Sequence, residues 1–222
     1  MSQSFEAGAA DITADILLET QSVHFRPNQP FTLTSGRKSP VYIDCRRLIS
    51  FPRARRKLMD LGTELIERQI GFESLDAIAG GETAGIPFAA WIAERLALPM
   101  LYIRKQPKGF GRMSQIEGVL AEGARVLLVE DLISEGTSKL NFIRGIRAAS
   151  GVVEHNFCIF HYGIFPSSVQ TLRDENVALH ALATWHEVLD RAHRLGSFED
   201  ADYLAIRSFL DAPNDWVPPE GA

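Results

Sequence analysis

The chain has 222 residues, 45% of them hydrophobic, which is enough to bury the core of one large α/β domain or two small ones. Its 23 basic and 28 acidic residues leave a net charge of −5, so the chain as a whole offers no attraction to nucleic acid or to an anionic membrane. Two cysteines, Cys45 and Cys158, are too few for a disulfide framework and fit a reducing environment. Because we find no basic, apolar leader and no apolar run near the ~20 residues of a membrane span, we expect a cytoplasmic protein.

The first part of the chain predicts a helix, then short strands, then a second helix. Apolar residues recur at helical spacing over residues 10–20, which indicates an amphipathic helix. Residues 23–49 mix β-forming residues with Pro, Asn, Gly and Ser, so they predict short strands joined by turns, one of them over 40–45. Pro52 then begins a long helical pattern with one apolar face.

The central part of the chain alternates short apolar runs with helical patterns. We expect strands over residues 75–79, 100–103, 126–129 and 152–160, helices over 85–97 and 137–149, and two further helices after residue 186. Residues 104–118 are charged, contain glycine and have little apolar periodicity, so they predict an irregular loop. Strands that alternate with helices indicate βαβ units, and the sequence therefore predicts an α/β fold with a mostly parallel sheet.

Residues 126–138, VLLVEDLISEGTS, carry the clearest functional pattern. Glu130 and Asp131 follow an apolar run, at the carboxyl end of a predicted strand, where parallel α/β sheets bind ligands. Neighbouring carboxylates repel each other, so we expect them to accept hydrogen bonds from ligand hydroxyls or to face a divalent cation. The hydroxyl-rich loop that follows leads into a helix, whose first N–H groups suit an anion. Each feature alone is more often a strand end or a helix cap, but together they predict a site for a ribose 5-phosphate.

This segment resembles the phosphoribosyl pyrophosphate (PRPP) motif of type I phosphoribosyltransferases: an apolar strand, two acidic residues, two apolar residues and a Thr/Ser–x–Gly–Thr loop. The resemblance implies that Glu130 and Asp131 bind the ribose hydroxyls. It also assigns to PRPP the residues that follow, with the 5-phosphate on the loop: Leu132, Ile133, Ser134, Glu135, Gly136, Thr137 and Ser138. Mg²⁺ suits phosphate oxygens, so we expect it as a cofactor bound through PRPP, with the acidic pair as its candidate protein contacts.

Three other segments resemble the orotate branch of this family. PFTLTSGRKSPVYID (30–44) is similar to its N-terminal hood, and AGGETAGIPFAAWIA (79–93) is similar to its pyrophosphate loop and following helix. MLYIRKQPKGFGRMSQIEG (100–118) resembles its mobile catalytic loop. The Ser-Gly-x-x-Ser-Pro and Ile-Glu-Gly pieces favour the orotate branch over the hypoxanthine and adenine branches. With the PRPP motif, the resemblance spans residues 30–150.

The resemblance implies the type I phosphoribosyltransferase fold, which is a mostly parallel central sheet flanked by helices, in a single domain over residues 1–222. We expect a small hood formed mainly by residues 1–50, a core over 70–185 and C-terminal helices over 186–212. It further implies that Thr83 and Ala84 contact PRPP. The residues that it assigns to orotate are Tyr42, Ile43, Arg37 and Ser134.

Cations gather in the segment 104–118: Arg104, Lys105, Lys108 and Arg112. Beside a phosphate site, such a loop is suited to close over a pyrophosphate leaving group and to neutralise its growing charge. We predict that Lys108 has this catalytic role, that Arg104 and Lys105 grip the diphosphate, and that Asp131 favours the positive charge developing on the ribose. In the family this loop reaches the neighbouring subunit's site, which implies a homodimer.

The chain also departs from the family's pattern. Phe110 replaces a His of the mobile loop, while Thr34 and Ala84 stand where Lys is common. Residues 154–165 lack the Arg that grips the orotate carboxylate, and His161 or Tyr162 occupies that neighbourhood. Our hypothesis is that Arg37 or Lys38 supplies the missing cation.

These features predict that N1 of orotate displaces pyrophosphate from PRPP, giving orotidine 5′-monophosphate. Two alternatives stay open. Another base is a candidate substrate because the carboxylate-binding Arg is missing, and a non-catalytic PRPP-sensing regulator is a candidate function for the same fold. The lysine-rich loop favours an enzyme.

Overall fold

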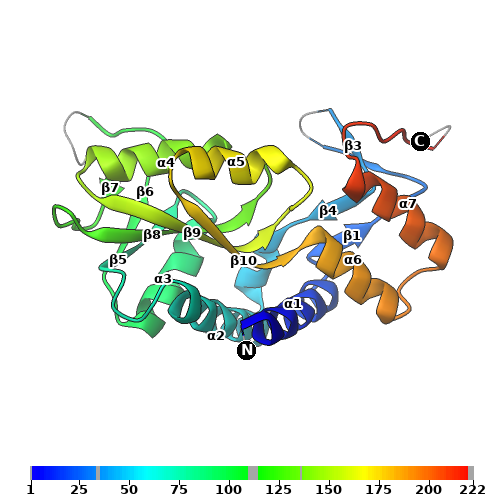
Figure 1. Ribbon diagram of the computed structural model, residues 1–222, viewed down its shortest axis with the longest axis horizontal. Coiled ribbons are helices and arrows are strands. Elements are labelled where there is room, and N and C mark those ends of the chain that lie inside the picture. Colours follow the sequence, from blue (N-terminus) through cyan, green and yellow to red (C-terminus); the bar gives the residue numbers. More distant parts are fainter. Residues whose placement is uncertain (1, 34–35, 110–114, 136, 220–222) are drawn as a thin grey trace.

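The centre of the computed structural model is a twisted six-stranded sheet, formed within the residues that the structure describes, 2–33, 36–109, 115–135 and 137–219 (Figure 1). In spatial order its strands are β10 (Ala178–Thr184), β9 (Val152–His161), β8 (Arg125–Ile133), β5 (Ala77–Gly81), β6 (Met100–Ile103) and β7 (Ile116–Glu117). The first five run parallel, and β7 pairs antiparallel with β6. The predicted α/β architecture with a mostly parallel sheet is therefore confirmed.

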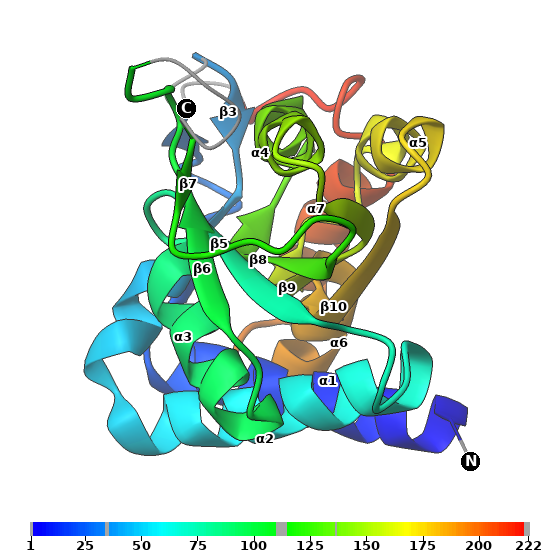
Figure 2. The ribbon, with the colours of Figure 1, turned by 90° about the vertical axis from the view of Figure 1, so that its left-hand side faces the viewer.

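Helices cover both faces of this sheet. Figure 2 shows α1 (Ser2–Glu19), α2 (Pro52–Gln69) and α3 (Gly85–Leu96) on one face, with α4 (Thr137–Ala148) and α5 (Pro166–Asp174) on the other. The central strand β8 contributes side chains to the hydrophobic cores on both faces of the sheet. Leu127 and Val129 pack with α1–α3, while Val126 and Leu128 pack toward α4. Strands buried on both faces read as continuous apolar runs, which explains why this part of the sheet could be predicted.

The hood consists of two small antiparallel pairs beside the main sheet. Strand β1 (Val23–Phe25) pairs with β4 (Val41–Ile43), and β2 (Phe31–Thr32) pairs with β3 (Lys38–Ser39). The 3₁₀-helix η1 (Cys45–Ser50) then leads into α2. Helices α6 (Trp185–Arg194) and α7 (Asp200–Asp211) lie on the hood side of the molecule (Figure 1). The Phe25 ring packs edge-on against Trp185. The two predicted C-terminal helices are confirmed.

Some predicted boundaries differ from the structure. Helix α1 starts at Ser2 instead of residue 10, and the segment 104–118, expected to be irregular, contains β7. Helix α5 and strand β10 were not predicted. Strand β10, ALHALAT, carries a buried histidine in an otherwise apolar stretch, so its sequence alone does not indicate a core strand. Within the described ranges, no helix has both the length and the apolar composition needed to cross a membrane.

A chain of hydrogen bonds lies near the amino ends of β9 and β10. Nδ1 of His155 is 3.0 Å from Nε2 of His180, and Nδ1 of His180 is 2.5 Å from the Gln69 side-chain oxygen. The Gln69 amide nitrogen donates to Glu6 at 2.9 Å. Because an amide oxygen only accepts, Nδ1 of His180 donates to Gln69. Burial lowers the pKa of both imidazoles, which favours their neutral forms, and a neutral His180 accepts from His155 at Nε2.

We expect His180 to make stability depend on pH between 6.5 and about 4. Burial lowers the pKa of His180 from 6.5 to about 4, and the side chain is only 8% exposed. Its contribution is complete above pH 6.5 and is lost as pH falls toward 4, because the unfolded imidazole then binds a proton that the folded one refuses. The full loss is about 3 kcal/mol of unfolding free energy.

The measurement is urea unfolding at several pH values for the wild type and for His180→Gln. Glu130 acts with the opposite sign, because its raised pKa of about 7 makes stability fall as pH rises from 4.5 to 7. Since both proteins contain Glu130, the difference between their stability curves isolates the contribution of His180. The matched control is His24→Gln, which removes an exposed histidine of the hood. Equal pH slopes for wild type and His180→Gln would contradict the prediction.

Candidate active site

A cavity of about 880 Å³ opens at the carboxyl ends of β5, β6 and β8. Five of the residues predicted to bind PRPP line it: Thr83, Ala84, Lys105, Glu130 and Asp131. The other lining residues are Arg46, Ile49, Glu82, Pro87, Gln106, Lys139, Asn141 and Phe142. The fold thus brings the predicted ribose-binding pair, part of the predicted pyrophosphate loop and one cation of the segment 104–118 around one cavity.

The acidic pair lies within strand β8 and does not end it. The expectation that the strand stops at Val129 is wrong, because β8 continues to Ile133 and keeps its register with β9, with Glu130 opposite Cys158. The ladder uses backbone groups, so charged side chains do not interrupt it. Both side chains are buried, Glu130 at 3% and Asp131 at 9% exposure. Neighbouring residues of a strand point to opposite faces, so the two carboxylates leave the backbone in different directions.

The Glu130 carboxylate is held between β5 and α4. Its Oε2 lies 3.0 Å from Nζ of Lys139. Its Oε1 faces Gly81, where a Cβ would collide with it, and has no hydrogen-bond partner in the described part of the chain. Glycine is therefore needed at position 81 for the Glu130 carboxylate to lie between β5 and α4.

Burial changes the acidity of the pair. Burial raises the pKa of Glu130 to about 7, although Lys139 acts in the opposite direction. Burial also raises the pKa of Asp131, again opposed by Lys139. Buried carboxylates need hydrogen-bond donors, and the hydroxyls of a sugar would supply them. Hydroxyl groups of a ligand therefore suit this pair as hydrogen-bond donors.

The segment 104–118 is tied to the cavity at its first residues. The Lys105 N–H donates to Glu82 at 2.7 Å, and the Asn141 amide donates to the Lys105 carbonyl at 2.7 Å. Arg104 forms an ion pair of 3.2 Å with Glu117 of β7 and does not line the cavity. These contacts fix the base of the segment on both sides of the cavity.

Lys108, four residues after Arg104, is exposed and does not line this cavity. Phe110 and Arg112 lie outside the described residues. The structure therefore separates the predicted diphosphate-binding cations: Lys105 lies in the cavity, Arg104 is engaged elsewhere, and Lys108 is in solvent.

The predicted phosphate loop joins β8 to α4. The Ile133 side chain is fully buried in the core on one face of the sheet, and Leu132 packs against the core on the other face, so only the backbones of these two residues are available to a ligand. Ser134 and Glu135 are exposed, and α4 begins at Thr137. Gly136 and the side chains of Thr137 and Ser138 are outside the described residues. The start of a twelve-residue helix beside the cavity is a suitable place for a phosphate.

The residues predicted to bind the base lie in and near the hood. The Tyr42 ring is 5.5 Å from Phe31 and stacks on His24, lining a separate cavity of about 350 Å³, while Ile43 is buried in the core. The Arg37 guanidinium lies 5.1 Å from the centre of the Phe165 ring. None of these side chains lines the main cavity. Thr34 lies outside the described residues.

The two residues that stand near the missing Arg have other contacts. Nε2 of His161 is 2.9 Å from the Ser168 hydroxyl at the start of α5. Tyr162 packs edge-on against Trp185, and burial raises its pKa to about 12. Both side chains are thus engaged elsewhere, His161 with α5 and Tyr162 with the first residue of α6.

Of the eight lining residues that were not predicted, four have side-chain hydrogen bonds or ion pairs near the cavity: Arg46, Glu82, Lys139 and Asn141. Arg46 forms a 2.7 Å ion pair with Asp44 and faces the cavity from η1. One of the four left a signal in the sequence. Lys139 stands in the first turn of α4, where a cation opposes the helix dipole, so its position indicates a nearby anion.

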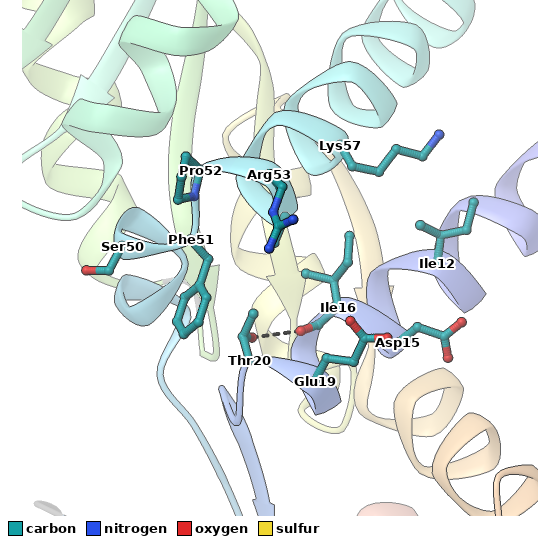
Figure 3. A pocket seen from close by; sticks show the side chains of 11 residues that line it. Ile12, Asp15, Ile16, Glu19, Thr20, Ser50, Phe51, Pro52, Arg53 and Lys57 are labelled. Carbon is teal, nitrogen blue, oxygen red and sulfur yellow. Dashed lines mark hydrogen bonds between the residues drawn. The ribbon is translucent and has the colours of Figure 1, made fainter.

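A second cavity, of about 620 Å³, lies between the end of α1 and the start of α2. Figure 3 shows Ile12 and Ile16 of α1 on one side, with Phe51 and Arg53 across from them, and Thr20 bonded to the Ile16 carbonyl at 2.7 Å. The charged side chains around it include the exposed Glu19, Arg53 and Lys57. It contains no buried charge, unlike the cavity around Glu130, which we therefore take as the candidate active site.

Comparisons with known proteins agree with this assignment, although no family model matches the chain. The chain is 55% identical over 207 residues to orotate phosphoribosyltransferase of Cereibacter sphaeroides, covering 93% of this chain and 89% of that protein. The structure of orotate phosphoribosyltransferase from Aeropyrum pernix matches with a TM-score of 0.70 and 31% identity over 84% of this chain and 99% of that chain. Leishmania donovani UMP synthase matches with a TM-score of 0.76 and 27% identity over 92% of this chain, which spans only 42% of that longer chain. The chain has the fold of type I phosphoribosyltransferases and belongs to the orotate phosphoribosyltransferase family.

Proposed function

We propose that this protein transfers the phosphoribosyl group of PRPP to N1 of orotate, giving orotidine 5′-monophosphate and pyrophosphate. The observation that carries this function is the 55% identity over 93% of the chain to a protein named for it. The site supports it, because a buried pair of carboxylates and the start of a helix meet around one cavity.

In this reaction the bond from C1 of the ribose to the diphosphate oxygen breaks, and a bond from C1 to N1 of orotate forms. Positive charge develops on the ribose ring, and the Asp131 carboxylate is placed to favour it. The first turn of α4 anchors the 5-phosphate, which is remote from the reacting carbon and so supplies binding energy for positioning. Lys105 binds the diphosphate, and Lys108 and Arg104 join it when the segment 104–118 closes.

Mg²⁺ fits this site as a cofactor held through PRPP. Hard phosphate and hydroxyl oxygens are the ligands that it prefers, and it retains several waters. Because Glu130 is already paired with Lys139 at 3.0 Å, PRPP would supply most of the ligands, and Glu130 and Asp131 would be the protein groups that contact the ion. When bound, the ion offsets the charge of the diphosphate.

We propose a cytoplasmic homodimer in which the segment 104–118 is shared between subunits. Lys108 lies in solvent, outside the cavity of its own subunit, which supports a role in a neighbouring one. Both cysteines are buried and free, as expected in a reducing compartment.

We further propose that Arg37 binds the orotate carboxylate. From the hood it reaches Phe165, four residues after the end of β9, which is the neighbourhood where the family's Arg is missing. Tyr42, Ile43 and Ser134 are proposed to complete the base site.

The test is to follow orotate absorbance with PRPP and Mg²⁺, with uracil, hypoxanthine and adenine as parallel substrates. We expect consumption of orotate that depends on PRPP. Turnover of another base in place of orotate would overturn the specificity and keep the enzyme class. Binding of PRPP with no turnover of any base would favour a PRPP-sensing regulator.

A further inference from the structure

Lys139 forms a buried ion pair inside the active-site cavity. Its Nζ lies 3.0 Å from Oε2 of Glu130, and the side chains are only 12% and 4% exposed. By contrast, Lys105 and Lys108 of the segment 104–118 are exposed. Lys139 is thus a cation that the fold has placed beside the ribose-binding pair and has largely removed from water.

The position of Lys139 is unfavourable for its own helix. It stands in the first turn of α4, where the helix dipole repels a cation, and its long side chain loses rotamer freedom when it is buried. The compensating interaction is the one with Glu130. A residue that contradicts its local preference inside a ligand cavity indicates a functional role.

Apart from Lys139, the Glu130 carboxylate has few polar partners. Its Oε1 lies against Gly81 without a hydrogen-bond partner among the described residues, and the Phe142 ring borders the same space. Without Lys139, the carboxylate would be buried and unpaired, so it would rotate away from this place or bind a proton.

We propose that Lys139 is a positioning residue, which keeps the Glu130 carboxylate oriented and charged for the ribose hydroxyls of PRPP. This inference rests on the proposed function. A direct contact of Lys139 with the 5-phosphate is the competing role, because α4 begins at the proposed phosphate site. The two roles differ in whether Lys139 acts through Glu130.

A double-mutant cycle separates them. The variants are Lys139→Met, Glu130→Gln and the double variant, with KM for PRPP and kcat measured for each. We expect Lys139→Met to raise KM for PRPP about 10–100-fold, as losses of such supporting contacts do. The double variant should be no worse than Glu130→Gln alone, because residues that act as one unit are not additive. Effects that multiply in the double variant would overturn the proposal in favour of a direct phosphate contact.

Binding and rescue give a second readout. Lys139→Met should weaken binding of ribose 5-phosphate and leave binding of inorganic phosphate unchanged, since only the former carries hydroxyls for Glu130. Lys139→Arg should recover most of the affinity for PRPP, because it keeps a cation near the carboxylate. Equal weakening of both ligands would contradict the proposal.

Controls distinguish this inference from folding and from the function itself. Arg144→Met removes a charge from the same helix, at a side chain that is 68% exposed and paired with Glu175, and should leave KM for PRPP unchanged. Melting temperatures of all variants show whether the fold persists, and the uncharged double variant avoids an unpaired buried charge. Wild-type protein that is inactive with orotate and PRPP contradicts the proposed function, whereas active wild type with an unaffected Lys139→Met contradicts this inference alone.

Discussion

Lys108→Ala should lower kcat for orotate by about 10²–10³-fold, the usual effect of removing one preorganised contact to a developing charge. The affinity for PRPP should change much less, because the cavity proposed to bind PRPP does not include Lys108. The Lys105–Glu82 and Asn141–Lys105 hydrogen bonds hold the base of the segment in either variant. Steady-state kinetics and calorimetric titration with PRPP measure the two quantities.

The matched control is Lys57→Ala, which removes an exposed lysine of α2 and should leave kcat unchanged. Sharing of the segment between subunits can be tested by mixing Lys108→Ala with Asp131→Asn protein. Half of the randomly formed dimers are then mixed, and each has one site without either substitution, so about a quarter of wild-type activity should return. No recovery after subunit exchange would contradict a shared segment, and full activity of Lys108→Ala would contradict its catalytic role.

Gly85→Ala should lower stability by about 3 kcal/mol, at the upper end of the usual cost of overpacking a core. Gly85 is the first residue of α3, and a Cβ there would collide with the Val129 carbonyl oxygen and lie 3.4 Å from Cα of Glu130. Backbone cannot yield as a side-chain end can, so α3 must move away from β8, directly beside the acidic pair. For a chain of this size the midpoint of thermal unfolding should fall by about 6–12 °C, and activity should fall with it.

Gly8→Ala is the control for this prediction. Gly8 is exposed on α1, and a Cβ there meets no atom within 4 Å. The same substitution should therefore be neutral or stabilising by about 0.5–1 kcal/mol, because alanine favours a helix. A melting temperature for Gly85→Ala within error of the wild type would show that the α3–β8 contact is loose.

The central unit could be predicted because its physical causes are local. Strands covered on both faces must be apolar throughout, so the run over 100–103 coincides with β6 and the run over 152–160 nearly coincides with β9. Strand β10 and helix α5 were not predicted, and for β10 the physical cause is not local. The polar His180 is acceptable in a core strand only because His155 and Gln69 satisfy it from elsewhere in the chain.

By itself, the sequence determined the alternation of strands and helices, the place of Glu130 and Asp131 at the ligand edge of the sheet, and the family. Periodicity, strand direction and a contiguous motif are properties of neighbouring residues, so they can be read along the chain. Only the tertiary structure decided that β8 runs through the acidic pair, that Gly81 and Lys139 enclose Glu130, and that Arg37 lies on Phe165 and outside the main cavity. These contacts join segments far apart in sequence, and their energies come from burial and exact distance, which no local pattern specifies.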